Sequence, residues 1–363
     1  MAEHGAIIGW DVGGAHVKAC LLQRGEVHDV AQWACALWQG IGRLTPVLQA
    51  ARERWPALAE AQHAITMTGE MVDLFASRED GVPRIAAQLT NSLAGPDPGS
   101  VHFFGGDAGW VAPADVGAQW RAIASANWLA TARHAALRFG DGVLVDIGST
   151  TTDLVAFKAG RVASVSRSDA ERLASGELVY QGVVRTPLCA LAQRIEWRGT
   201  AHNVMNEFFA TTADVYRLSG DLNPEHDQYP SADNAAKDLP ATRQRLARMV
   251  GLDQQDGTAP DWLAFARSWR QKQVAEIGGQ LHRVLTAQRL GPQAVVVSAG
   301  CGDFLVGDVL AQAEAGASVR RVAAYGREVA CVAAGANQVA VRAWAQVCAP
   351  CVAVAALFEQ ERR

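Results

Sequence analysis

Residues 142–157 read GVLVDIGSTTTDLVAF, an apolar run, a short stretch of glycine and hydroxyl residues, and a second apolar run. Two such runs bounded by turn residues predict the two strands of a β-hairpin. The four residues that follow, KAGR at 158–161, predict its far end. Asp146 stands two residues before Gly148, so the first predicted strand ends in a carboxylate beside a glycine turn.

The N-terminal stretch has the same form. Residues 6–22 read AIIGWDVGGAHVKACLL, with Asp11 two residues before Gly13. The segment after the glycines is β-like and ends in a turn, so this is a hairpin and not the strand-to-helix unit of a dinucleotide fold. Two similar hairpins in one chain indicate an internal repeat, with two related halves facing one cleft.

Periodicity and turn signals predict the remaining elements. Helices are expected over residues 44–61, 71–75, 122–139 and 330–347, and strands over residues 64–67, 101–104 and 294–303.

These elements predict an α/β fold of two domains. The first is expected over residues 1–139 and the second over 140–345, with a mostly helical insertion at about 200–290. A polar, Pro- and Asp-rich surface loop is expected at 223–240. Residues 346–363 are expected to form a tail, with the C-terminal helix packing back on the first domain.

The composition limits the classes of function that this chain can have. The 363 residues are 49% hydrophobic and 19% charged, with 33 Lys and Arg against 37 Asp and Glu and a net charge of −4. This excludes disordered and fibrous classes and argues against a nucleic-acid partner. No run of about 18 apolar residues predicts a membrane span, and the start, MAEH, lacks the basic and apolar regions of a signal peptide. We therefore expect a cytoplasmic protein, its oligomeric state open and a homodimer one option.

Seven cysteines are too few, and odd in number, for a disulfide framework. The Cys348-x-x-Cys351 pair has no second pair and no strand-to-helix context, so we interpret it as structural. Buried, unreactive thiols are expected at the other five positions, Cys20, Cys35, Cys189, Cys301 and Cys331.

The two hairpin turns carry the residue types that bind phosphate. Glycines let backbone N–H groups approach an anion, and hydroxyls add donors. The candidates are Gly13, Gly14, Gly148, Ser149, Thr150 and Thr151. Carboxylates beside a phosphate can hold Mg²⁺, so Asp11 and Asp146 are expected to flank one ion, supported by Asp153. The alternative is that these aspartates cap ordinary turns.

Two basic residues lie near the first turn. Lys18 could reach the same phosphate oxygens, and a solvated surface lysine is the alternative. His16 could donate to the phosphate, and a structural turn histidine is the alternative.

The arrangement resembles the actin-like ATPase superfamily of actin, heat-shock-70 and sugar kinases. There the segments similar to DVGG at 11–14 and DIGST at 146–150 bind phosphates, and SAGCG at 298–302 resembles the adenosine loop. The resemblance implies two ribonuclease-H-like domains around a central phosphate-binding cleft, with Gly300 and Gly302 at the nucleotide. Cys301 departs from the Gly-Gly pattern, which leaves ATP binding open.

Three further segments are similar to a narrower branch, the hydantoinase/oxoprolinase-like proteins linked to tetrahydromethanopterin-dependent one-carbon transfer. They are TMTGEMVD at 66–73, YQGVVRTP at 180–187 and EFFATTADVYR at 207–217. Archaeal members of this branch include a condensing enzyme of methanofuran biosynthesis. The resemblance implies a transferase that joins an aminomethylfuran-methyl diphosphate to a glutamyltyramine, forming an aryl ether and releasing diphosphate.

That reaction suggests further roles. The phenol has an ordinary pKa of about 10, so a base should help to ionise it. Glu70 is the candidate, and a charge at a helix N-terminus is the alternative. Arg185 could grip the diphosphate or the γ-glutamyl carboxylate, and a surface arginine is the alternative. Asp107 and Asp214 are further candidates.

Two other function classes stay open on the sequence. An ATP-dependent small-molecule kinase or ATPase would use the third glycine segment, and a non-catalytic nucleotide sensor would use the same fold without turnover. Stabilisation by Mg-ATP would favour the first of these, and stabilisation by diphosphate alone would favour the transferase.

Overall fold

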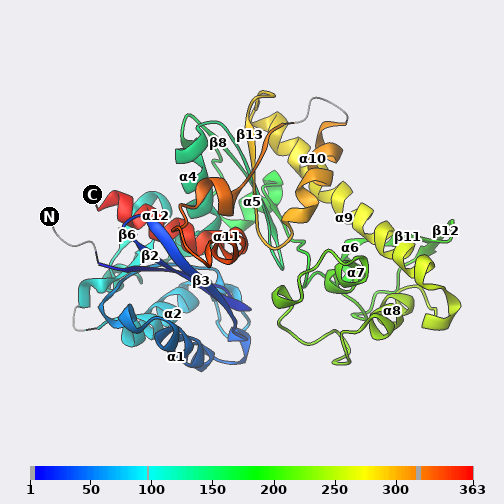
Figure 1. Cartoon of the computed structure of the whole chain (residues 1–363), viewed down its shortest axis with the longest axis horizontal. Helices are drawn as coiled ribbons and strands as arrows, with labels where there is room; N and C mark the ends of the chain where they lie inside the picture. Colours follow the sequence, from blue (N-terminus) through cyan, green and yellow to red (C-terminus); the bar gives the residue numbers. More distant parts are fainter. Residues whose placement is uncertain (1–4, 96–97, 316–319, 363) are drawn as a thin grey trace. The chain divides into compact units, whose positions relative to one another are not determined.

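A computed structural model describes residues 5–95, 98–315 and 320–362 (Figure 1). The chain divides into two compact units. The first comprises Met1–Gly142, Phe157–Ala163 and Ala323–Arg363, and the second comprises Val143–Ala156 and Ser164–Val322. Each unit contains one mixed sheet with helices, so the α/β class expected from the sequence is confirmed.

The first sheet has six strands in the order β3-β2-β1-β4-β5-β6. They are β1 (Ile7–Val12), β2 (His16–Gln23), β3 (Glu26–Ala34), β4 (Gln62–Met67), β5 (Val101–Phe104) and β6 (Trp110–Val111). The strand β2 pairs antiparallel with β1 and β3, whereas β4 lies parallel to β1 and β5 parallel to β4. This order, with an antiparallel second strand, is the ribonuclease-H-like arrangement.

The second sheet repeats this order as β10-β8-β7-β13-β14. Its strands are β7 (Gly142–Ile147), β8 (Thr152–Lys158), β10 (Leu178–Val179), β13 (Val295–Ala299) and β14 (Val322–Ala324), and β9 (Arg161–Val162) pairs with the end of β8. Both predicted hairpins and the third strand are therefore present. The hairpin β7–β8 occupies the same place in its sheet as β1–β2 in the first.

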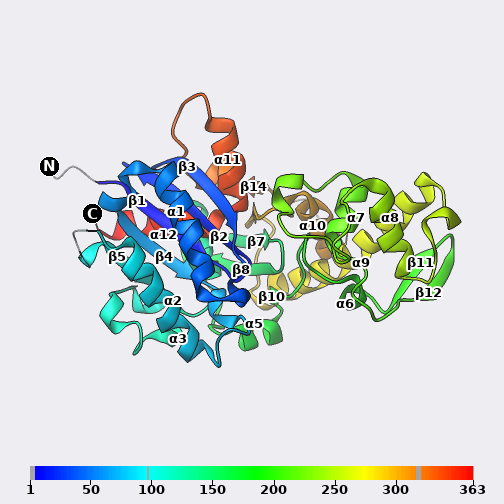
Figure 2. The same cartoon turned by 90° about the horizontal axis from the view of Figure 1, so that it is seen from below.

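Helices cover both faces of the first sheet (Figure 2). The helices α1 (Leu44–Arg54) and α2 (Arg78–Leu93) share one core with Ile8, Trp10 and Val12. The helix α12 (Ala349–Glu361) lies on the other face against β1, β2 and β4.

The contact of α12 with β1 is very close. A Cβ on Gly9 would lie 2.0 Å from the carbonyl oxygen of Cys351, so only glycine fits there. Residues that the sequence predicted as a tail are thus a buried helix of the first unit.

Several predicted helices are shorter than expected. The stretch 44–61 ends as α1 at Arg54, because Pro56 disfavours helical backbone at the residue before it, and a 3₁₀ turn (Pro56–Glu60) follows. The helix expected at 71–75 is absent: a 3₁₀ turn covers Gly69–Met71, and α2 begins only after Ser77, whose side chain caps it.

One further expected helix is divided into two, and another begins later than expected. The stretch 122–139 forms α3 (Trp120–Ile123) and α4 (Asn127–Phe139). The stretch 330–347 becomes helical only at α11 (Gln338–Val347).

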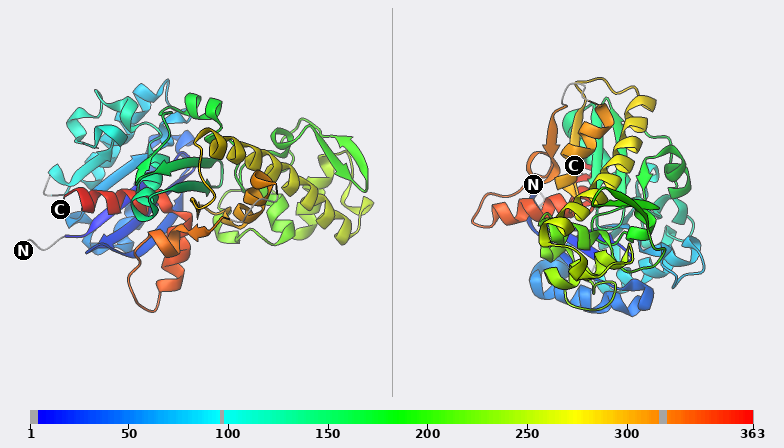
Figure 3. Two further views of the ribbon diagram at one scale, coloured as in Figure 1. Left: turned by 90° about the horizontal axis from the view of Figure 1, so that it is seen from above. Right: turned by 90° about the vertical axis from the view of Figure 1, so that its right-hand side faces the viewer.

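The second unit carries most of the remaining helices. These are α5 (Asp169–Ser175), α6 (Leu188–Leu191), α7 (Thr212–Ser219), α8 (Leu239–Arg248), α9 (Ala259–Ala287) and α10 (Val306–Glu314). Figure 3 shows α9 as the long yellow helix of this unit, and α7 and α8 pack against it. A small hairpin, β11 (Arg194–Trp197) and β12 (Thr200–Asn203), precedes α7.

Within the described residues, no single helix is long and apolar enough to span a membrane, although α11 and α12 together meet the length and composition criteria as a pair bent by 99°.

All seven cysteines are free thiols. Five of them are buried, but the expectation is wrong for Cys331, which is exposed, and Cys189 is only half-buried.

One buried histidine makes the first unit sensitive to pH. The indole Nε1 of Trp10 donates to Nδ1 of His63 at 3.2 Å, and burial lowers the pKa of His63 to about 4. An unfolded histidine has a pKa of about 6.5, so below that value the unfolded chain binds a proton that the folded chain refuses. Stability is therefore lost as the pH falls from about 6.5 towards 4.

We expect the free energy of unfolding to show this loss. For His63 alone the loss between pH 7 and pH 5 is about 2 kcal/mol. The measurement is urea unfolding of the wild type and of His63→Asn, which keeps an acceptor for Trp10, at both pH values. The difference between the two proteins gives the contribution of His63 to the loss of stability. Equal losses in the two proteins would contradict the assignment.

Candidate functional site

The two hairpin turns are closed by the same hydrogen bond. In the first turn the N–H of Gly13 donates to the carbonyl of His16 at 2.9 Å, and in the second the N–H of Gly148 donates to the carbonyl of Thr151 at 2.8 Å. Each glycine follows its aspartate, Asp11 or Asp146, by two residues. The sequence equivalence is therefore also an equivalence of backbone geometry.

The carbonyls of the second turn are occupied by a neighbouring loop. The N–H of Val183 donates to the Gly148 carbonyl at 3.0 Å, and those of Val184 and Arg185 donate to the Ser149 carbonyl at 3.1 and 2.8 Å. The turn must therefore present its other polar edge, the N–H groups, away from this loop.

These N–H groups are the candidate anion site. Those of Ser149, Thr150 and Thr151 have no acceptor in the part of the chain that the structure describes, and the three residues are only half-buried. Successive outward N–H groups in a turn bind phosphate and carboxylate oxygens. The hydroxyls of Ser149 and Thr150 share a hydrogen bond at 3.4 Å, which leaves one of them to add a further donor. We call residues 148–151 the anion-binding turn, after the role that the sequence predicts for them.

The first turn is built on the same plan. The N–H groups of Leu37 and Cys35 donate to the carbonyls of Gly14 and Ala15 at 3.1 and 2.8 Å. His16, which begins β2, is buried. Both turns thus have their carbonyls bound by a segment that follows them in the chain.

The turn glycines differ in how tightly the protein itself packs around them. None of Gly13, Gly14 and Gly148 has a positive φ, so the backbone does not require glycine there. A Cβ would lie 2.9 Å from the His16 carbonyl oxygen at Gly13 and 2.6 Å from a methyl of Val72 at Gly14. At Gly148 it would lie 3.4 Å from the Thr151 carbonyl oxygen, which is ordinary contact. The protein itself therefore leaves room for a side chain at Gly148.

The third glycine segment packs against the end of β7. Gly300 has a φ of +86°, and a Cβ there would lie 2.2 Å from the Ile147 carbonyl oxygen and 2.5 Å from Oδ1 of Asp146. The N–H of Gly302 donates to that Ile147 carbonyl at 2.8 Å. These glycines hold the end of β13 beside Asp146, and their role at an adenosine stays a prediction.

The aspartates differ in their partners. Oδ2 of Asp11 lies 3.8 Å from Nζ of Lys18, on the adjacent strand, and Asp11 is 4% exposed. Asp153 is bound to Nη2 of Arg172 at 2.6 Å, and Arg172 is buried. Because that ion pair occupies the Asp153 carboxylate, the structure favours a structural role for it over metal binding.

Asp146 is the remaining predicted metal ligand of the second unit. It is half-buried at the end of β7, two residues before the anion-binding turn. The described residues contain no group of three His, Cys, Asp or Glu side chains that could hold a metal. Mg²⁺ does not need one, since it is commonly held by one or two carboxylates, waters and phosphate oxygens. Asp11 belongs to the other unit, so its sharing of one ion with Asp146 stays a prediction.

Glu70 lies buried beside the first turn. It is 1% exposed, and its Oε1 accepts a hydrogen bond from the Ser125 hydroxyl at 2.9 Å. Ser125 has a φ of +51°, an uncommon conformation for serine. A Cβ on Gly69 would lie 3.3 Å from the backbone carbon of Gly13, which shows how closely the two segments pack. Glu70 lies in the 3₁₀ turn Gly69–Met71, and no α-helix begins there.

Arg185 joins the second turn through its backbone. Its side chain is half-buried, with the guanidinium carbon 5.7 Å from the ring centre of Tyr229. A cation over an aromatic face is held by the ring quadrupole. The structure therefore places Arg185 at the anion-binding turn, and its contact with a substrate stays a prediction.

The remaining two candidates have structural partners. Asp214 is 2% exposed, forms a capping box with Thr211 and binds Arg245 and Arg217, each at 2.8 Å. A carboxylate occupied in this way serves the fold of α7. Asp107 forms an ion pair with Arg133 in the first unit.

Sequence reasoning missed Gly182. A Cβ on it would lie 2.4 Å from the Thr150 nitrogen, so the chain passes directly against the anion-binding turn there. Its carbonyl accepts hydrogen bonds from the Thr212 hydroxyl at 2.9 Å and from Gln273 at 3.0 Å. The only signal was its place in the segment 180–187, because a glycine has no side chain to suggest a role.

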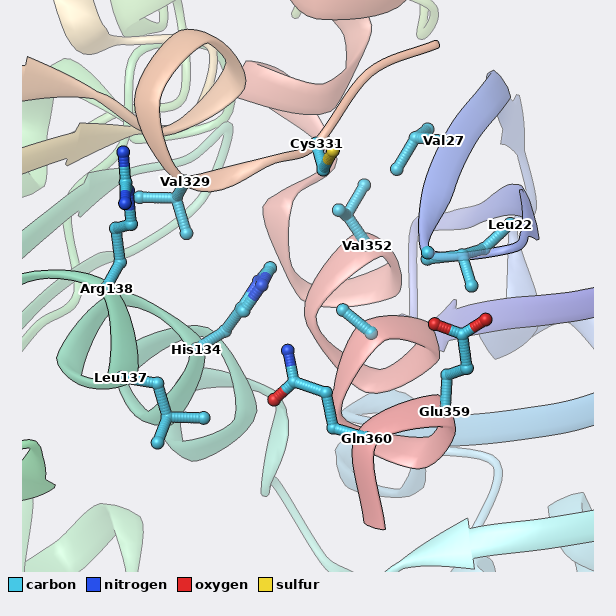
Figure 4. Close-up of a pocket in the computed structure, with 12 residues that line it drawn as sticks. Leu22, Val27, His134, Leu137, Arg138, Val329, Cys331, Val352, Glu359 and Gln360 are labelled. Atoms are coloured by element: carbon cyan, nitrogen blue, oxygen red, sulfur yellow. The ribbon is translucent and has the colours of Figure 1, made fainter. Parts of the chain in front are cut away.

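A cavity of about 290 Å³ lies elsewhere in the first unit (Figure 4). Leu22 and Val27 line it near the β2–β3 turn, at the opposite end of β2 from the first hairpin turn. The eight residues of β2 span about 26 Å. The cavity therefore does not belong to that turn.

One wall of this cavity is formed by His134. Its Nδ1 lies 2.7 Å from the hydroxyl of Tyr325, and burial lowers its pKa to about 4. The imidazole is therefore neutral at pH 7.

Comparisons with known proteins agree with this architecture. A nucleotide-free acetone carboxylase structure matches with a TM-score of 0.51 and 10% identity, covering 83% of this chain and 66% of that one, just under two thirds of its length. This likeness shows the fold. A ROK-family glucokinase from Streptomyces griseus, in complex with glucose and AMPPNP, matches with a TM-score of 0.45 and 12% identity over 98% of this chain and 100% of its own.

Two curated proteins are similar in sequence, and both are named (4-{4-(2-(gamma-L-glutamylamino)ethyl)phenoxymethyl}furan-2-yl)methanamine synthase. The protein from Methanocaldococcus jannaschii is 28% identical over 305 residues, 84% of this chain and 88% of its own. The protein from Methanococcus vannielii is 28% identical over 170 residues, 47% of this chain and 75% of its own. The hydantoinase/oxoprolinase family profile matches residues 62–359. The chain therefore belongs to the hydantoinase/oxoprolinase family.

Proposed function

We propose that this chain is a transferase of methanofuran-type cofactor biosynthesis that forms an aryl ether and releases diphosphate. The observation that carries the proposal is the anion-binding turn, with three N–H groups that have no acceptor among the described residues and two hydroxyls. The curated relatives are named for a product in which a phenoxymethyl group is joined to a furan. A chain with a phosphate site and such relatives is suited to making that bond from a phosphorylated furan.

We propose the following reaction. The phenol oxygen of a glutamyltyramine attacks the exocyclic CH₂ of an aminomethylfuran-methyl diphosphate, and the new C–O bond forms there. The bond from this carbon to diphosphate breaks, and the electron pair leaves with the diphosphate. The phenolic proton passes to a base, for which we propose Glu70.

The protein's contribution is charge stabilisation and orientation. Negative charge develops on the departing diphosphate, and preorganised N–H donors stabilise it in the transition state. Arg185 adds a cation at the same turn. Mg²⁺ held by Asp146 and phosphate oxygens would neutralise further charge. In the first unit, Asp11 and Lys18 offer the equivalent carboxylate and an additional cation.

The direct experiment supplies both substrates. The protein is incubated with Mg²⁺, the furan diphosphate and γ-glutamyltyramine, and diphosphate and the ether product are followed by mass spectrometry. Formation of both in equal amounts is expected. If no ether forms and Mg-ATP rather than diphosphate raises the melting temperature, the kinase or ATPase function replaces this one.

Gly148→Ala separates a phosphate site from an ordinary turn. The added methyl has room in the protein but faces an anion bound on the turn. We expect the affinity for Mg-diphosphate to fall by about tenfold or more with little change in melting temperature. Isothermal titration and a melting curve give the two quantities.

Gly300→Ala is the matched control. Its methyl would meet the Ile147 carbonyl oxygen at a positive φ, so a lower melting temperature is expected. Unchanged affinity in Gly148→Ala would remove the anion-binding turn from the proposal.

A pair of Asp→Asn variants tests the cation. Asp146→Asn should lower turnover by about 100-fold or more, because a carboxylate is lost from the metal. Asp153→Asn should instead lower the melting temperature, because it leaves the buried charge of Arg172 without its carboxylate. Steady-state turnover at saturating Mg²⁺ and thermal melting compare them. Equal turnover in the two variants would contradict the assignment of Asp146.

A further inference from the structure

Three side chains bind one backbone carbonyl in the second unit, that of Gly182. The Thr186 hydroxyl donates to it at 3.1 Å, the Thr212 hydroxyl at 2.9 Å and Nε2 of Gln273 at 3.0 Å. A backbone carbonyl has only two lone pairs, so three donors are more than it needs. The donors come from the loop itself, from the first turn of α7 and from the middle of α9.

Gln273 is oriented for this bond from its other end. It is 0% exposed, and its Oε1 accepts the hydroxyl of Tyr216 at 2.6 Å. With the amide oxygen on Tyr216, the amide NH₂ must face Gly182. A buried amide is costly unless its polar atoms are paired, and here both ends are paired.

We infer that Gln273 is a positioning residue for the anion-binding turn and acts through Gly182; the inference rests on the proposed function of that turn. Gly182 packs directly against Thr150. The next three residues in the chain, 183–185, supply the N–H groups that bind the turn's carbonyls.

Loss of the hydrogen bond from Gln273 to the Gly182 carbonyl has a specific consequence. Without the donor from Gln273, the Gly182 carbonyl is held by the two threonine hydroxyls alone, and the N–H groups of residues 183–185 are fixed less firmly. The hydrogen bonds from these N–H groups to the turn then break more often. Affinity for an anion falls although the hydrophobic core is unchanged.

Gln273→Glu tests this with an isosteric change. An ionised glutamate has no donor for the Gly182 carbonyl, whereas a protonated one does. Burial raises the pKa of a carboxyl, so the ionised form is expected only at the alkaline end of a pH series. At pH 8 we expect the dissociation constant for Mg-diphosphate to rise about threefold to tenfold above that of the wild type, and to return towards it as the pH is lowered.

Charged groups near residue 273 do not explain a pH-dependent difference in affinity between the wild type and Gln273→Glu. Burial raises the pKa of Tyr216, which contacts residue 273, and the charged groups acting on Tyr216 are Arg270, Asp221 and Asp308. These groups are the same in the wild type and the variant. The pH-dependent difference between the two proteins therefore reports the side chain at 273.

Matched variants exclude a general loss of stability. Thr212→Val removes the second donor at nearly constant shape and should weaken binding, whereas Thr212→Ser keeps the hydroxyl and should not. Tyr216→Phe removes the contact that orients Gln273 but leaves Nε2 as a donor for Gly182, so it should lower the melting temperature and weaken binding less than Gln273→Glu does. If Tyr216→Phe weakens binding as much as Gln273→Glu at the same loss of melting temperature, the inference is wrong.

Hydrogen exchange decides the inference even if diphosphate does not bind. The amides of Val183, Val184 and Arg185 should exchange faster in Gln273→Glu than in the wild type at pH 8, whereas those of Cys35 and Leu37 in the first unit should not. Failure of the wild type to bind diphosphate would reject the proposed function alone. Unchanged exchange at residues 183–185 would reject the role of Gln273.

Discussion

The rest of the candidate site depends on one constraint: the carbonyls of each hairpin turn are bound by backbone N–H groups of a later segment. Residues 183–185 do this for the second turn, and Cys35 and Leu37 do it for the first. A peptide whose oxygen is bound on one side presents its N–H on the other. The polarity of each turn is therefore set by main-chain hydrogen bonds, and the glycines serve close packing more than unusual dihedral angles.

Much of this arrangement could be predicted from the sequence. Alternating apolar runs around glycine turns predicted both hairpins, the third strand and the repeat, because strand periodicity and turn chemistry are local properties. The 3-2-1-4-5 strand order of both sheets is consistent with the fold that the resemblance implied. The aspartates Asp11 and Asp146 stand at the strand ends as expected.

The features that could not be predicted from the sequence depend on partners distant in the chain. Asp153 was predicted to support the metal, and Arg172, 19 residues later, binds its carboxylate. Asp214 was a further candidate for the site, and Arg245 binds it. Gly182 matters through its backbone alone, which no side-chain pattern could indicate. Residues 349–361 were predicted as a tail because an Ala- and Val-rich run does not say which surface will bury it.

The packing of α12 on β1 has a consequence for the order in which the protein can be assembled. Gly9 and Cys351 touch across 342 positions of the chain, so one face of the first sheet stays uncovered until residues 349–361 have been synthesised. Contacts of such long range are closed slowly, and exposed apolar strands invite association in the meantime. When all residues of the second unit have left the ribosome, the first unit still lacks the helix that covers one face of its sheet. The second unit can therefore complete its fold before the first unit, although the first unit begins earlier in the chain.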